Sequence, residues 1–295
     1  MKSNICRSIK NKEMLFKHLP LFQPTLLFNK FSKGFILSSP NWLKDLTGAW
    51  LFYTVFPKLT RINPRFERIA RFSPLIGVLI GVLQVSVLIL LLQLQWPNES
   101  MPFIAIALGL WITGGIHVDG LMDTADGIAA GPSRCIEAMK DSRIGASGII
   151  ALTINLLLQI AALFKLRLLI LFAIPIASFW GRYSQIWAIS HYPYLNKEGS
   201  SKFLHKKNWR GFLIESIPSY AFLSFLIFIL INIDISIIST PNLIIGIIVG
   251  FLPALIIPHL LARRLGGHSG DSYGASVVLV ETCMLIIFSI ILPAS

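Results

Sequence analysis

The residues best suited to chemistry are three aspartates in the segment GGIHVDGLMDTADGIAAG, residues 114–131. Asp119, Asp123 and Asp126 follow an i, i+4, i+7 spacing, so on a helix their carboxylates lie within about 60° of one another. Like charges on one stripe repel and destabilise an isolated helix, which indicates that a cation binds there. Oxygen ligands without His or Cys suit Mg²⁺ or Mn²⁺, which share their coordination shell with substrate phosphates. The stripe predicts a Mg²⁺ site, and a solvated acidic face is the alternative.

A second polar cluster follows in EAMKDSRIGASG, residues 137–148. It contains Asp141 and Arg143, and the planar guanidinium of an arginine suits a phosphate or a carboxylate. We therefore expect Arg143 to contact a phosphate or a carboxylate. A local salt bridge between the two side chains is the alternative.

A third cluster, ARRLGGHSGDSYGAS at residues 262–276, is rich in glycine. Successive backbone N–H groups in such a segment can form an anion-binding nest. The prediction is a substrate-binding loop that includes Gly267, His268, Gly270 and Asp271, with a flexible turn as the alternative. Carboxylates for a divalent metal, an arginine for phosphates and a glycine nest together indicate phosphoryl or nucleotidyl transfer.

The composition places these clusters on a membrane protein. Hydrophobic residues make up 54% of the 295 residues and charged residues only 14%, about half the charged share of a soluble domain. No CxxC or CxxH spacing occurs, and neither a P-loop nor a dinucleotide motif is present, which argues against zinc, redox and soluble nucleotide-binding folds. Several apolar runs reach the roughly 20 residues that a transmembrane helix needs.

We predict an all-α polytopic protein with about seven transmembrane helices. The expected spans are 73–95, 102–118, 146–164, 168–190, 212–231, 242–261 and 274–292. An eighth apolar stretch, 46–56, is too short to span and ends at Pro57, so we predict an interfacial or re-entrant helix there.

Basic residues indicate the orientation of these helices. Nearly all the basic residues of the body fall in the loops 58–72, 119–145, 191–211 and 262–273. The intervening loops 96–101 and 232–241 carry one acid each and no base. Because Lys and Arg are biased toward the cytoplasm, the loops with the three polar clusters are predicted to face it. Few ionisable groups lie within the spans, which favours an enzyme over a transporter.

Residues 1–45 form a basic N-terminal extension, separate from a membrane-embedded domain at 46–295. Residues 1–44 hold seven Lys, one Arg and one acid. We predict a flexible arm on an anionic membrane surface; a targeting extension, a start codon assigned too far upstream and a nucleic-acid arm are the alternatives. The expected partners are the lipid bilayer and small-molecule substrates, with no nucleic acid, and the sequence indicates no oligomeric state.

Four strings resemble, in order and spacing, the motifs of the cobalamin synthase family, also called adenosylcobinamide-GDP ribazoletransferase. They are FERIARFSPLIGVLIG, HVDGLMDTADG, EAMKDSRIGASG and ARRLGGHSGDSYGA, and the resemblance runs from about Leu46 to the C-terminus. It implies a multi-pass enzyme of the bacterial inner membrane that joins adenosylcobinamide-GDP to α-ribazole or its 5′-phosphate and releases GMP. It also implies dependence on Mg²⁺. For this reaction Asp119, Asp123 and Asp126 are the expected metal ligands, and one of them, or Asp141, is the candidate catalytic base.

Two other classes of protein remain as alternatives. A CDP-alcohol phosphotransferase also uses an aspartate cluster at the membrane face, but its pattern includes an Ala-Arg pair that is missing after DGLMDTADG. A cation transporter with the acid stripe as its ion site is the alternative outside the enzymes.

Overall fold

The computed structural model describes residues 39–58, 61–195, 209–232 and 240–292. Within these ranges the chain forms helices and no strand, apart from an isolated bridge between Tyr194 and His268. The prediction of an all-α polytopic fold is confirmed. Residues 1–38, which hold most of the predicted basic arm, lie outside the described residues.

Apolar helices cover the expected spans, although the spans expected at 102–118 and 242–261 are each divided between two helices. The apolar helices are α3 (Ser73–Gln93), α4 (Met101–Thr113), α7 (Ala146–Leu166), α8 (Ile170–His191), α9 (Phe212–Asn232), α10 (Thr240–Val249), α11 (Phe251–Leu265) and α12 (Gly270–Ile291). Shorter elements are α2 (Asn41–Tyr53), η1 (Ile69–Phe72), η2 (Asn98–Ser100), α5 (Ile116–Ala129), α6 (Cys135–Ala138) and η3 (Arg167–Leu169).

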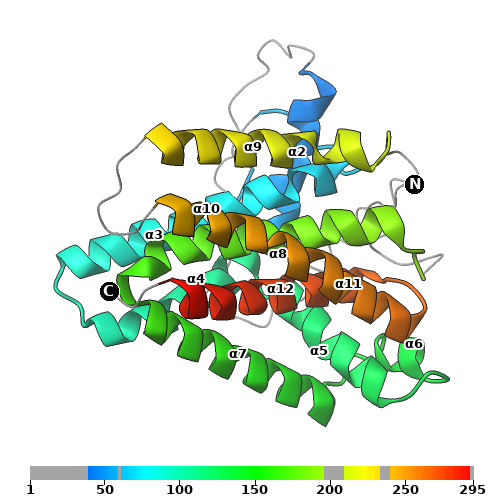
Figure 1. The fold of residues 1–295 in the computed structure, drawn as a ribbon. Coiled ribbons are helices and arrows are strands. Elements are labelled where there is room, and N and C mark those ends of the chain that lie inside the picture. The colour runs from blue at the N-terminus through cyan, green and yellow to red at the C-terminus, as the bar shows by residue number, and fades with distance from the viewer. Residues whose placement is uncertain (1–38, 59–60, 196–208, 233–239, 293–295) are drawn as a thin grey trace, which may run out of the picture.

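Among the residues that the structure describes, four segments are long and apolar enough to cross a membrane by length and composition, or five if the bent pair α4–α5 counts as one span. One of the four, Ala146–His191, contains 46 residues. It comprises α7 and α8, which η3 joins, and Figure 1 shows α8 running back in the direction opposite to α7. This segment is therefore a helical hairpin, as the two spans predicted at 146–164 and 168–190 require.

The span predicted at 102–118 is interrupted. α4 ends at Thr113 and α5 begins at Ile116, with an angle of 91° between the two helices. Gly114 and Gly115 both have left-handed φ angles, 62° and 69°, a conformation that glycine adopts at little cost. α5 therefore turns away from the axis of α4, and its acids lie at one end of the bundle.

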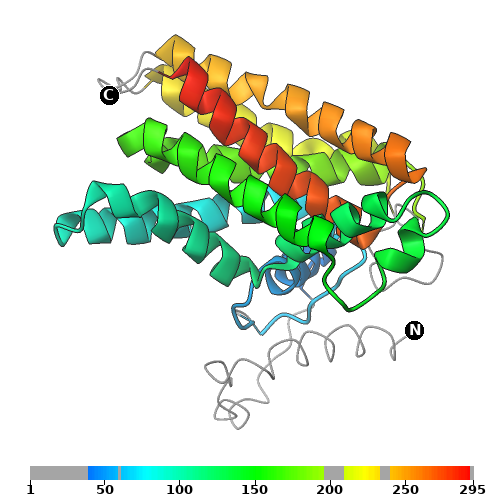
Figure 2. The same ribbon diagram turned by 90° about the horizontal axis from the view of Figure 1, so that it is seen from below.

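The core forms around α8, which packs against α3, α11 and α12 (Figure 2). Glycines allow the closest approach: a Cβ on Gly77 would lie 2.4 Å from the Ser178 carbonyl oxygen, and one on Gly81 would lie 2.5 Å from the Pro175 Cα. The largest hydrophobic cluster includes Phe179 of α8, which is fully buried. Such close packing fixes the ends of the helices relative to one another.

Figure 1 shows that α7, α9 and α12 begin at one end of the bundle, where α8 and α11 finish and α5 and α6 lie. We call this the α5 end. α2 begins at Asn41, ahead of the domain boundary expected at residue 46. Asp45 is buried there and accepts two hydrogen bonds from the Arg65 guanidinium, of 2.6 and 2.7 Å.

Candidate active site at the α5 end

The site is built on a close approach between α5 and the start of α12. A Cβ on Gly120 would lie only 2.4 Å from the backbone oxygen of Asp271, and one on Gly274 would lie 3.2 Å from the Cα of His117. Two glycines on facing helices therefore allow the backbones to meet. The consequence is that Asp271, which is distant in sequence, lies beside the acid stripe of α5.

Three carboxylates come together at this contact, and we call Asp119, Asp123 and Asp271 the acid cluster. Asp119 is exposed, whereas Asp123 and Asp271 are half-buried. Burial, together with the nearby charges of Asp119 and Asp271, raises the pKa of Asp123 to about 7. Asp271 was predicted to lie in the glycine-rich loop, and its place beside the stripe was not predicted.

Asp126, the third acid of the stripe, has a different environment. One of its carboxylate oxygens accepts a hydrogen bond from the Gly145 N–H and the other from the Gly148 N–H, each at 2.8 Å. Both donors lie at the N-terminus of α7, where amides lack partners within the helix. Asp126 thus caps α7 and ties it to α5. Its predicted metal contact stays a prediction.

The acid cluster fits a divalent cation whose remaining ligands come from elsewhere. Among the residues of the described ranges, no group of three or more His, Cys, Asp or Glu side chains is arranged to hold a metal ion by itself. Mg²⁺, however, is commonly bound through one or two carboxylates together with waters and substrate phosphates. Asp119, Asp123 and Asp271 supply oxygen ligands only, and no basic side chain in the described part of the chain forms an ion pair with them.

Asp141 and Arg143 pair with each other on the loop between α6 and α7. Their side chains form a salt bridge of 2.7 Å, and the Arg143 side chain is 88% exposed. Hydrogen bonds from Arg143 lower the pKa of Asp141 to about 2, so this carboxylate is a weak base as placed. The same loop contains Gly145, which contacts Asp126. The pair therefore borders the site and is free to reach a ligand.

The glycine-rich loop is held firmly by its own side chains. His268 is fully buried, and its two ring nitrogens contact the Ser272 hydroxyl at 2.9 Å and the Pro258 carbonyl at 3.1 Å. Burial lowers the pKa of His268 to about 4, so the ring is neutral. Its backbone N–H donates to the Pro193 carbonyl, 2.8 Å away. These contacts favour a positioning role for His268; its predicted contact with substrate stays a prediction.

The remaining glycines of this loop have local roles. A Cβ on Gly267 would lie 2.5 Å from the Pro193 carbonyl oxygen, so the loop packs directly against the chain that follows α8. Gly270 is the first residue of α12, and Ser269 caps that helix by accepting a hydrogen bond from the Ser272 N–H. The loop thereby fixes the position of Asp271 in the acid cluster. Substrate binding by Gly267 and Gly270 stays a prediction.

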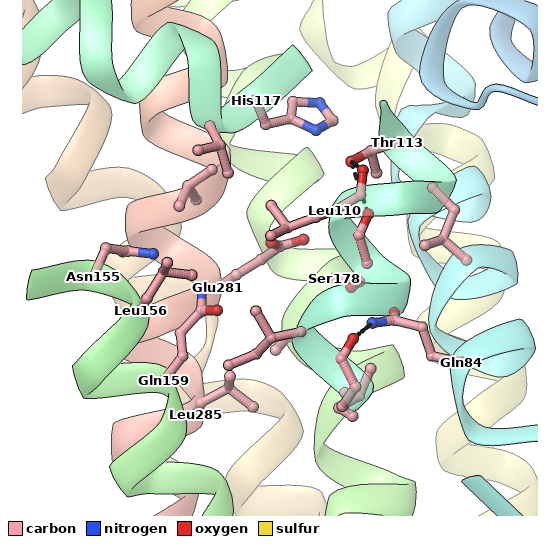
Figure 3. A pocket seen from close by; sticks show the side chains of 18 of the residues that line it. Gln84, Leu110, Thr113, His117, Asn155, Leu156, Gln159, Ser178, Glu281 and Leu285 are labelled. Atoms are coloured by element: carbon pink, nitrogen blue, oxygen red, sulfur yellow. Dashed lines mark hydrogen bonds between the residues drawn. The ribbon is translucent and has the colours of Figure 1, made fainter. Parts of the chain in front are cut away.

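A cavity of about 90 Å³ with both apolar and polar side chains in its wall extends from the α4–α5 bend into the bundle. Figure 3 shows His117 at one end of the cavity, with Gln84, Asn155 and Glu281 lining it further in. This volume is large enough for several waters. No pattern in the sequence predicted this cavity, because its lining comes from six separate helices.

Two hydrogen-bond donors in the cavity wall have no partner among the described residues. They are the amide nitrogen Nδ2 of Asn155 and the Nε of Arg182, and both residues are almost fully buried. The Arg182 Nη1 donates to Glu281 at 2.7 Å. Because buried polar groups are normally hydrogen-bonded, the cavity suits waters or a polar part of a ligand.

Comparison with known proteins identifies relatives over most of the chain. The cobalamin-5-phosphate synthase family matches residues 45–289. An adenosylcobinamide-GDP ribazoletransferase from Prochlorococcus marinus is 49% identical over 263 residues, which cover 88% of this chain and 100% of the relative. Proteins of the same name from Synechococcus sp. and Desulforamulus reducens are each 35% identical, and cover 83% and 80% of this chain and 96% and 92% of the relatives, respectively.

No solved structure matches the chain. The match to the family covers all the helices that form the α5 end, including the acid cluster and the glycine-rich loop. The relative from Prochlorococcus marinus is covered along its whole length. The chain therefore belongs to the cobalamin-5-phosphate synthase family.

Proposed function

We propose that this protein is a Mg²⁺-dependent adenosylcobinamide-GDP ribazoletransferase. It transfers the adenosylcobinamide phosphate moiety of adenosylcobinamide-GDP to α-ribazole or its 5′-phosphate, and it releases GMP. The product is adenosylcobalamin or its 5′-phosphate. The observation that carries the proposal is the acid cluster, which has no basic partner among the described residues and lies in a chain related to proteins of that name.

The proposed location is the bacterial inner membrane, with the α5 end facing the cytoplasm. The basic segments within the described ranges, which precede α3 and follow α6 and α11, border this end. Lys and Arg flanking transmembrane helices favour the cytoplasmic side. GDP-linked substrates are highly polar, so access from the cytoplasm also suits their chemistry.

The reaction forms one phosphorus–oxygen bond and breaks another. The hydroxyl oxygen of α-ribazole attacks the phosphorus nearer the corrinoid, the bond to the bridging oxygen breaks, and GMP leaves with that oxygen. The proton of the hydroxyl passes to a carboxylate. In such transfers the protein mainly positions the reactants and stabilises developing charge.

The residues of the α5 end divide these tasks. One or two of the acids Asp119, Asp123 and Asp271 would hold Mg²⁺, and the cation would neutralise the diphosphate when bound. A carboxylate of the acid cluster that is not bound to the cation takes the proton, because Arg143 keeps Asp141 a weak base. The exposed Arg143 offers its guanidinium to the diphosphate. Asp126 and His268 position the helices that carry these groups.

The test is the release of GMP from adenosylcobinamide-GDP by the purified protein in detergent. Release that requires α-ribazole or its 5′-phosphate is the expected result. A folded sample that releases no GMP with either acceptor would contradict the proposal. A cytidine-diphosphate alcohol, tried in parallel, tests the alternative phosphotransferase.

A further inference from the structure

A cluster of arginines lies where α3 and α9 begin, apart from the acid cluster. We call Arg68, Arg71 and Arg210 the arginine cluster. Glu215 of α9 is fully buried beside it and accepts hydrogen bonds from the Arg68 guanidinium through both carboxylate oxygens. It also accepts a bond of 3.0 Å from the backbone N–H of Arg210. The negative charge of Glu215 is thus neutralised by Arg68.

Arg71 has no carboxylate partner among the described residues. Its Nε is buried without a hydrogen-bond partner there, and its guanidinium carbon lies 5.0 Å from the centroid of the Phe72 ring. The charges of Arg68 and Arg210 are close enough to repel it. Glu215 and Asp45 attract Arg71, but both acids are already hydrogen-bonded to other arginines, so an excess of positive charge remains.

A further donor lies in the same region. Trp209 precedes Arg210 and packs against the hydrophobic cluster that contains Phe72. Its indole Nε1 is buried and, like the Nε of Arg71, lacks a partner within the described ranges. The nearby acid Asp45 is already paired with Arg65 through two hydrogen bonds. The unsatisfied groups are donors, so a ligand must supply acceptor oxygens and negative charge.

The chemistry that fits best is a phosphate group. The planar fork of an arginine binds phosphate through two hydrogen bonds, and arginine is the preferred residue for this contact. Arg71 precedes the first turn of α3, and α9 begins at the α5 end (Figure 1). A phosphate bound here would therefore lie at the same side of the bundle as the acid cluster.

We propose that the arginine cluster binds a phosphate group through Arg71 and Arg210, with Arg68 held in place by Glu215. Two sources present this chemistry at the site. One is the 5′-phosphate of the acceptor nucleotide, which rests on the proposed function, and the other is the headgroup of an anionic phospholipid. In the first case the cluster selects the phosphorylated acceptor over free α-ribazole.

The first experiment measures binding without turnover. Inorganic phosphate is added to the detergent-solubilised full chain, and the midpoint of thermal unfolding is recorded for wild type, Arg71→Gln and the matched control Arg61→Gln. Arg61 is exposed in the same connecting segment. Phosphate should raise the midpoint of wild type and the control but leave Arg71→Gln unchanged. An equal response in all three would overturn the proposal.

The second experiment identifies the source of the phosphate. In detergent without phospholipid, Arg71→Gln should raise the KM for α-ribazole 5′-phosphate about 10- to 100-fold while that for α-ribazole stays within about twofold, the loss expected for charged hydrogen bonds. Arg71→Lys keeps the positive charge but lacks the planar guanidinium, so its KM for α-ribazole 5′-phosphate should rise less than that of Arg71→Gln. If both KM values are unchanged, nanodiscs of phosphatidylglycerol and phosphatidylcholine test the lipid.

Stabilisation of wild type by phosphatidylglycerol alone, lost in Arg71→Gln, would assign the site to a lipid headgroup. If Arg71→Gln changes neither the KM for α-ribazole 5′-phosphate nor the stabilisation by phosphatidylglycerol, both kinds of phosphate site are contradicted. Absence of turnover by wild type with both acceptors would contradict the proposed function, whereas the response to inorganic phosphate would still decide the binding site.

Discussion

Two sets of carboxylates in this protein have opposite surroundings. Acids inside the bundle each pair with an arginine: Asp45 with Arg65, Glu215 with Arg68, and Glu281 with Arg182. In the described part of the chain, no arginine pairs with the acids of the acid cluster, which are Asp119, Asp123 and Asp271.

The acids that pair with an arginine stabilise the fold, whereas the unpaired acids of the acid cluster are placed to bind a ligand. An unpaired carboxylate that leaves water is costly, and pairing with an arginine offsets much of that cost. The fold provides such a partner for Asp45, Glu215 and Glu281. Three mutually repelling acids at the α5 end are stabilised by a ligand that brings positive charge, and a divalent cation does so.

The largest effect is expected from Asp123→Asn, which keeps the size of the side chain but removes its charge. Loss of a metal ligand should lower kcat/KM at least ~10³-fold, about 4 kcal/mol of transition-state stabilisation. Thermal unfolding should be unchanged or shifted upward, because repulsion within the acid cluster falls. Glu137→Gln, at an exposed acid on α6, is the matched control. Activity of Asp123→Asn within tenfold of wild type would contradict the assignment.

Glu281→Leu should act on stability. It leaves the buried guanidinium of Arg182 without its carboxylate, and breaking a buried pair in this way costs about 3–5 kcal/mol of unfolding free energy. Unfolding in detergent measures this loss. The double variant Arg182→Met with Glu281→Leu should recover most of it, and failure to recover would show that the pair contributes more than mutual neutralisation.

Gly120→Ala tests the helix contact that completes the acid cluster. The added Cβ would lie 2.4 Å from the Asp271 oxygen, so α12 must move away from α5. We expect kcat/KM to fall about 10- to 100-fold, since a displacement of about 1 Å near a reacting group costs about that much. Ala129→Ser, at an exposed position of the same helix, is the control. Unchanged activity would mean that Asp271 is not needed beside Asp123.

The smallest effect is expected from Asp126→Asn, which weakens the cap on α7. The amide can still accept one of the two N–H bonds, so the loss should be about 0.5–2 kcal/mol in unfolding free energy. Activity should fall less than in Asp123→Asn. A loss of activity as large as that of Asp123→Asn, without loss of stability, would instead return Asp126 to the metal site.

The sequence predicted the helices and the acid stripe because both depend on local regularities. Long apolar runs identify α3, α7, α8 and α12, and a period of 3.6 residues places Asp119 and Asp123 on one face. The break after Thr113 was missed, because the span was judged by apolar length while two left-handed glycines decide the bend.

Contacts between distant residues could not be predicted. Asp271 joins the acid cluster only because Gly120 lets α12 approach α5. Asp126 caps a helix that begins about 20 residues later, and His268 is buried by α11 and α12, which meet around it. Such contacts depend on tertiary packing, and one sequence carries no direct signal for it.

The most direct test of the account removes the cation and restores it. GMP release from adenosylcobinamide-GDP and α-ribazole is measured after treatment with EDTA and again as Mg²⁺ is added, for wild type and Asp271→Asn. We predict that EDTA abolishes release, that Mg²⁺ restores it in wild type, and that Asp271→Asn needs more Mg²⁺. Release that continues in EDTA would contradict the central claim that the acid cluster acts by holding a divalent cation.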